Sequence, residues 1–94
     1  MDGKITKEMI EELQRAIVSI DDIGVCEEFL KDLFTVTEME QFAQRLRAAK
    51  LLLEGQTYAQ IIAKTDISSA TLSRVSNCVR HGNGGYRSVL EKIK

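Results

Sequence analysis

The sequence has 94 residues, 44 % of them hydrophobic and 29 % charged, which is typical of a single small globular domain. Its 13 basic and 14 acidic residues leave a formal net charge of −1 and so exclude a histone-like polycation. No apolar run approaches the ~18 residues of a membrane-spanning helix, and the acidic, amphipathic N-terminus is not expected to be a secretory signal.

Two helices are expected in the first third of the chain, because apolar residues recur there at helical spacing and nothing alternates with the period of a strand. The first helix is predicted to begin with Thr6 as its N-cap and to break at Asp21 and Asp22. The second carries a shorter apolar stripe, from Val25 to Leu33.

The longest apolar stripe runs from Met39 to Leu53 and predicts the longest helix. Thr37 and Glu40 have the spacing of a capping box, in which each side chain accepts a hydrogen bond from the other residue's backbone N–H. The helix is therefore predicted to begin there. Gly55 is suited to the left-handed conformation that follows a helix, and we expect it to end this one.

Two short helices with a tight turn between them are predicted to follow. Thr57 and Gln60 form a second capping box, and the helix that they open is expected to stop before Asp66. Ser68 or Ser69 is expected to cap the next helix. The inner faces of the two helices are predicted to carry Tyr58, Ile61 and Ile62, and Leu72, Val75, Ser76 and Val79, respectively.

The last predicted helix spans residues 86–93 and follows a glycine-rich stretch at residues 81–85. The expected fold class is therefore all-α, with about six short helices. A chain this small buries a modest share of its surface, and helices of two or three turns are not stable alone. The apolar stripes of the first three helices indicate a homodimer with interleaved N-terminal helices, and a compact monomeric bundle is the alternative.

The segment at residues 57–80 has the organisation of a helix-turn-helix, whose first helix holds the N-terminal end of the second in the major groove of double-stranded DNA. Residues 1–44 carry 11 acidic and 4 basic side chains, whereas residues 45–94 carry 3 acidic and 9 basic ones. A polyanion would therefore meet the second half of the chain. The DNA-binding residues predicted from this segment are Gln60, Lys64, Ser68, Ser69, Ala70, Thr71, Ser73, Arg74 and Asn77.

Three separated motifs are similar to those of a known family. They are R-L-R-x-A-K-L-L-L-x-G at residues 45–55, S-x-A-T-L-S-R-x-S-N at residues 68–77 and G-x-G-G-Y-R at residues 82–87. With these motifs in the same order, nearly the whole chain resembles the tryptophan repressor (TrpR) superfamily. Within that superfamily it resembles the YerC/YecD branch of transcriptional regulators.

The resemblance implies an interlocked homodimer with two DNA-reading heads, and hence a sequence-specific transcriptional regulator acting as a repressor. It implies one TrpR-like domain over residues 1–94. Within that domain, residues 1–55 would form the core and dimerisation helices and residues 56–80 the helix-turn-helix. Residues 81–94 would form the glycine-rich turn and the C-terminal helix.

The resemblance also bears on effector binding. The family's amino-acid-sensing member clamps tryptophan between two arginines, and the matching positions here are Arg45 and Arg74. The residue after the second arginine is glycine in that repressor and Val75 here, and a β-branched side chain would clash with the indole. Cys78 replaces a serine of that repressor, so these four residues imply an effector pocket without tryptophan as corepressor. Asp66 replaces the usual turn glycine, and aspartate tolerates the left-handed conformation.

Two functions of other classes compete with DNA binding. An enzyme is not expected, because nothing completes a set of nucleophile, base and orienting group. His81 is the only histidine and gives with Cys78 two ligands where structural zinc has about four, so neither a metal nor a cofactor is predicted. The alternative function is a protein–protein interaction module that docks through its acidic helices and does not bind DNA. Cys26 and Cys78 form no C-x-x-C motif, and a reducing cytoplasm is the expected location.

Overall fold

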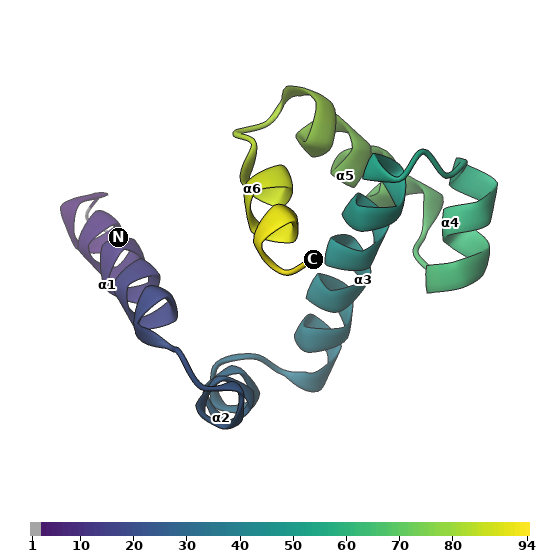
Figure 1. Cartoon of the computed structure of the whole chain (residues 1–94). Helices are drawn as coiled ribbons and strands as arrows, with labels where there is room; N and C mark the ends of the chain where they lie inside the picture. The colour runs from purple at the N-terminus through teal and green to yellow at the C-terminus, as the bar shows by residue number, and fades with distance from the viewer. Residues whose placement is uncertain (1–2) are drawn as a thin grey trace. The chain divides into compact units, whose positions relative to one another are not determined.

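The computed structural model describes residues 3–94, and this part of the chain contains no strand. The predicted all-α class is therefore confirmed. The chain divides into two compact units, Met1–Val36 and Thr37–Lys94. The helices of the described part, labelled in Figure 1, are α1 (Gly3–Ser19), α2 (Ile23–Leu33), α3 (Val36–Leu53), α4 (Tyr58–Thr65), α5 (Ser69–His81) and α6 (Gly85–Lys92).

The break predicted between the first two helices is confirmed, and Asp22 has a definite role in it. Asp22 is the N-cap of α2, and its carboxylate accepts a hydrogen bond of 2.9 Å from the backbone N–H of Val25. The cap predicted at Thr6 is wrong, because α1 already begins at Gly3. No helix-breaking residue lies between Gly3 and Thr6. Each residue added to a helix that has already formed contributes one backbone hydrogen bond, which favours the earlier start.

The start of α3 also differs from the prediction. The helix begins at Val36, so Thr37 lies inside its first turn and does not cap it. Thr35 and Glu38 have the same capping-box spacing as Thr37 and Glu40, and the start at Val36 is the one that this earlier pair predicts. Two overlapping patterns were therefore present in the sequence, and the first of them matches the helix.

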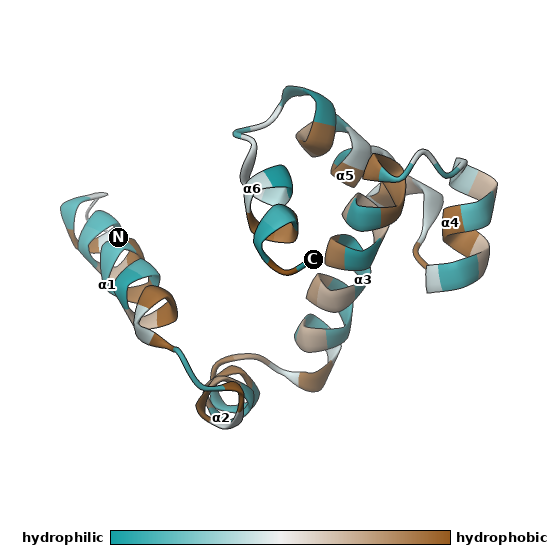
Figure 2. Cartoon of the chain, in the orientation of Figure 1, coloured by the Kyte–Doolittle hydropathy of each residue, from teal (hydrophilic) through white to brown (hydrophobic). Residues whose placement is uncertain are grey.

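The second unit is built around one hydrophobic core. Ile61 of α4 and Leu72 of α5 are its largest fully buried side chains. They pack with small residues from the C-terminal half of α3 and with Leu90 of α6, and Figure 2 shows apolar residues on each of these helices. Among residues 3–94, the buried apolar residues are Ala48, Ala49, Leu51, Ile61, Ile67, Leu72, Val75 and Leu90.

Left-handed backbone marks the three junctions between the helices of this unit. Gly55 has a φ of 86° after α3, which confirms it as the predicted end of that helix. Asp66 has a φ of 62° after α4, and Gly84 has a φ of 80° before α6. Because glycine has no Cβ, two of the junctions reach this conformation without steric cost, and the third depends on the tolerance of aspartate for it.

Candidate nucleic-acid interface

The first helix of the candidate interface is capped as its sequence predicts. The N–H of Gln60 donates to the Thr57 hydroxyl at 3.2 Å, and the N–H of Thr57 donates to Gln60 Oε1 at 2.9 Å. Ile61 is fully buried and Ile62 is half-buried, as expected for the inner face. Tyr58 was predicted on that face but is 37 % exposed. It is the first residue of α4, one turn before Ile61, and an amphipathic ring at such an edge keeps its polar end in water.

The turn between α4 and α5 is anchored by its own hydrogen bonds and by one buried side chain. The N–H of Asp66 donates to the carbonyl of Ile62 at 2.9 Å, which closes the end of α4. Thr65 Oγ1 donates to the carbonyl of Ile61 at 2.7 Å and accepts from the N–H of Ile67 at 3.3 Å. The Ile67 side chain is buried in the core. These contacts fix where α5 begins relative to α4.

Ser68 caps the second helix, which decides between the two predicted serines. Its hydroxyl oxygen accepts from the N–H of Thr71 at 3.2 Å. The same hydroxyl donates to Thr71 Oγ1 at 2.8 Å, so the two hydroxyl groups are held together. Ser69 and Ala70, which lie between them, are exposed.

The two faces of α5 differ in chemistry as the sequence predicts. The inner face packs on the core through Leu72 and Val75, with Val79 half-buried against it. Ser76 on the same face is also buried. The opposite face is exposed and carries small or polar side chains together with arginine. Its residues are Ser69, Ala70, Ser73, Arg74 and Asn77.

The predicted phosphate contact at the end of α4 has a hydrogen-bond partner that sequence reasoning missed. Lys64 is exposed, and its ammonium donates to Gln56 Oε1 at 2.8 Å. Gln56 precedes α4, and the bond therefore runs along the length of this short helix. Arg74 and Arg80 on α5 are also exposed. These cations all belong to residues 45–94, where basic side chains outnumber acidic ones.

The residues predicted for an effector pocket lie in contrasting environments. Val75 is 3 % exposed and is part of the hydrophobic core, whereas Arg74 and Cys78 are exposed. Arg45 is half-buried, with its guanidinium carbon 5.5 Å from the centre of the Phe42 ring. Its Nε is buried and makes no hydrogen bond within residues 3–94.

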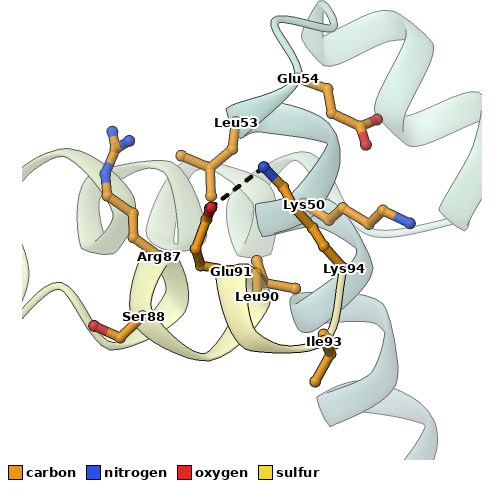
Figure 3. Close-up of a pocket in the computed structure, with 9 residues that line it drawn as sticks. All are labelled: Lys50, Leu53, Glu54, Arg87, Ser88, Leu90, Glu91, Ile93 and Lys94. Carbon is orange, nitrogen blue, oxygen red and sulfur yellow. Dashed lines mark ion pairs between the residues drawn. The ribbon is translucent and has the colours of Figure 1, made fainter.

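A cavity of about 680 Å³ lies elsewhere in the second unit, between the end of α3 and α6. Figure 3 shows its lining, including an ion pair of 3.3 Å between Lys94 and Glu91. None of the four residues of the predicted effector pocket lines this cavity. Residues 3–94 also contain no group of three His, Cys, Asp or Glu side chains able to hold a metal ion. Along the same stretch, no helix combines the length and apolar character needed to cross a bilayer.

Comparison with known proteins agrees with this description of the chain. The family model described as Trp repressor protein matches residues 8–94. The uncharacterized protein YerC of Bacillus subtilis (strain 168) is 38 % identical over 91 residues, covering 97 % of this chain and 88 % of that protein.

Two crystal structures are similar to the chain along most of its length. The TrpR-like protein of Eubacterium eligens ATCC 27750 has a TM-score of 0.89 and 37 % identity, over 98 % of this chain and 95 % of that one. A Staphylococcus aureus protein described as a candidate Trp repressor has a TM-score of 0.87 and 36 % identity. That match covers 92 % of this chain and 86 % of the other. The resemblance to TrpR-like proteins is therefore confirmed in both sequence and fold.

Proposed function

The chain belongs to the Trp repressor family, and from this premise we propose that it is a sequence-specific, DNA-binding transcriptional regulator that acts as a repressor. In this proposal α4 and α5 form the helix-turn-helix, and the N-terminal end of α5 enters the major groove of double-stranded DNA. The regulator acts as a homodimer, so that two such heads read half-sites related by two-fold symmetry.

The exposed face of α5 is the observation that carries the proposal. Its first turn presents Ser69 and Ala70, and Ser73 follows one turn later, so no bulky side chain stands between the backbone and an approaching base edge. Hydroxyl groups can both donate and accept, which suits base edges and phosphate oxygens alike. The opposite face is buried in the core, so the helix is held firmly while its outer face is free for contact.

Basic side chains beside this face supply the electrostatic part of binding. Lys64 stands at the end of α4, and Arg74 stands one turn beyond the first exposed residues of α5. In the proposal Lys64 contacts phosphate, and Arg74 contacts phosphate or guanine. Gln60, Ser68, Thr71 and Asn77 complete the proposed contact set.

The proposed homodimer is supported by apolar side chains that are exposed on α1 and on α3. On α1 the stripe of Ile5, Met9, Ile10, Leu13 and Ile17 is between 38 % and 51 % exposed. On α3, Phe42 and Leu46 are 43 % and 37 % exposed. Exposed apolar surface that recurs at helical spacing is typical of a protein–protein interface. Light scattering at micromolar concentration should therefore give twice the mass of one chain, and the mass of one chain would contradict the dimer.

We propose a small-molecule effector for this chain that differs from tryptophan, the ligand of the family's amino-acid-sensing member. In this proposal Arg45 and Arg74 bracket a small molecule. Val75, which is part of the core, takes the position of the glycine that leaves room for an indole in the tryptophan-sensing member of the family. We therefore propose that the effector is an unidentified small molecule other than tryptophan.

Selection of bound sequences from a random duplex pool, followed by fluorescence anisotropy, tests the proposed function. The selected duplex should bind more tightly than a scrambled duplex, and both affinities should fall as the salt concentration rises. No binding to either duplex at low salt would contradict the proposal and favour the protein–protein interaction module. Equal affinity for the two duplexes would contradict sequence-specific reading.

A further inference from the structure

One side chain of α3 reaches across to the end of α4. Gln44 Nε2 donates a hydrogen bond of 3.3 Å to the backbone carbonyl of Thr65, the last residue of α4. The two residues are 21 positions apart in the sequence, and the bond is partly buried. By contrast, the side-chain hydrogen bonds at Thr57 and Lys64 join residues within 56–64. Gln44 therefore ties α4 to a helix outside the helix-turn-helix.

The Thr65 carbonyl, which accepts the hydrogen bond from Gln44, is one of the carbonyls at the end of α4 that have no hydrogen-bond donor within the helix. The last four carbonyls of an α-helix have no N–H partner within the helix, and they are satisfied by side chains, water or the following turn. Thr65 is in addition the residue whose hydroxyl holds the N–H of Ile67. Thr65 is therefore hydrogen-bonded to Gln44, to Ile61 and to Ile67. Gln44 makes its bond from α3, whose C-terminal half contributes residues to the core.

We infer that Gln44 is a positioning residue, which fixes the α4–α5 turn on α3 and so sets the direction in which α5 is presented. Gln44 contacts the backbone of the turn, so it is expected to act through geometry rather than through contact with DNA. The inference deepens the proposed function and rests on it for its consequence in DNA reading. The effect of the hydrogen bond between Gln44 and Thr65, here called the Gln44 latch, can be measured without DNA.

Amide hydrogen exchange of the whole chain tests the latch. Gln44→Met keeps the length of the side chain but removes the donor, and Gln41→Met makes the same change at an exposed position one turn earlier on α3. The amides of Asp66 and Ile67 should exchange about 2- to 10-fold faster in Gln44→Met than in Gln41→Met, as expected for the loss of one hydrogen bond. The amide of Leu72 serves as the internal reference and should exchange at equal rates in the two variants.

The exchange result has clear contrary outcomes. Equal exchange at Asp66 and Ile67 in the two variants would overturn the inference. An equal acceleration at Leu72 would also overturn it, because that result means a general loss of stability. Gln44→Glu, which keeps the shape and replaces the donor by an acceptor, gives the same test if Gln44→Met does not fold.

The ratio of the affinities for a selected and a scrambled duplex separates a positioning role from a merely structural one, because a merely structural residue would not change this ratio. In Gln44→Met the affinity for a selected duplex should fall several-fold relative to that for a scrambled duplex, while Gln41→Met should keep the ratio of the unaltered protein. An unchanged ratio would overturn the positioning role. If the unaltered protein binds no DNA, the proposed function fails, and the exchange rates still decide whether the Gln44 latch exists.

Discussion

Thr57 and Gln60 satisfy each other's backbone N–H groups at the start of α4, with hydrogen bonds of 2.9 Å and 3.2 Å. Two of the four unpaired donors at the N-terminus of this helix are thereby used. Because α4 has only eight residues, each such bond is a large share of what holds it. The stability of the candidate interface therefore depends on a pair of side chains at one end of its shorter helix.

Thr57→Ala should lower the free energy of unfolding by about 0.5–2 kcal/mol, because the cap hydroxyl is removed. Thr57→Ser keeps the hydroxyl and serves as the matched control, with stability close to that of the unaltered protein. Urea denaturation followed by circular dichroism measures both. Equal stability of the alanine and serine variants would show that the capping box contributes nothing.

Asp66→Val should destabilise the chain by about 1 kcal/mol or more, because a β-branched residue adopts a φ of 62° only with strain. Asp66→Gly should leave stability within ~0.5 kcal/mol, since relief of strain and the greater freedom of the unfolded chain offset each other. Thermal unfolding of the two variants provides the comparison. A valine variant as stable as the glycine variant would be inconsistent with the left-handed turn.

Tryptophan should produce no binding heat in calorimetry with the unaltered protein, because Val75 lies in the hydrophobic core. Val75→Gly should open space at this position, at a cost of ~1 kcal/mol from the helix backbone and more from poorer packing. Val75→Ala is the control for the packing effect with less backbone effect. Micromolar binding of tryptophan by the unaltered protein would refute the prediction.

Ser69→Ala should change which duplex is preferred, at about 1–3 kcal/mol for each base pair no longer discriminated. Lys64→Ala should weaken all duplexes alike and lower the slope of log affinity against log salt by ~0.9 for each phosphate that is no longer neutralised. Anisotropy over a panel of duplexes measures both effects.

The control for Lys64 is Gln56→Ala. It breaks the same 2.8 Å hydrogen bond while the positive charge stays. The salt slope should therefore remain that of the unaltered protein in Gln56→Ala. If Ser69→Ala and Lys64→Ala have the same effect on every duplex, α5 is not oriented as proposed.

Glu27 and Lys31 form an exposed ion pair of 2.9 Å on α2. The hydrogen bond and the charge of Lys31 lower the pKa of Glu27, and Glu27 in turn raises the pKa of Lys31. A lowered carboxyl pKa stabilises the folded state above the unfolded-state pKa, and this contribution disappears as the pH falls through the folded-state value. The raised lysine pKa gives a contribution that disappears as the pH rises through it. A carbon NMR titration should show the Glu27 pKa returning to its ordinary range in Lys31→Met, and an unchanged pKa would contradict the pairing.

The elements of the candidate interface could be predicted because their signals are local. The capping box at Thr57, the stop at Gly55 and the two faces of α5 each depend on residues within a few positions of one another. The caps predicted at Thr6 and Thr37 were wrong, because a capping pattern does not exclude a helix that starts slightly earlier.

Contacts between residues distant in sequence could not be predicted. Nothing in the local pattern distinguishes Gln44, which reaches Thr65, from the exposed Gln41 on the same helix. Gln56 likewise has no motif that marks it as the acceptor for Lys64. Such hydrogen bonds depend on how helices are placed in space, and a periodic pattern contains no information about that placement.

Because α5 has one buried and one exposed face, substitutions that affect folding and substitutions that affect binding fall on different residues of the same helix. A substitution at Leu72 or Val75 alters whether the chain folds, whereas one at Ser69, Ala70 or Ser73 leaves the core untouched. If the proposed function is correct, descendants of this protein can exchange one binding sequence for another without passing through an unfolded intermediate. Divergence among such regulators is then expected to concentrate on one side of a single helix.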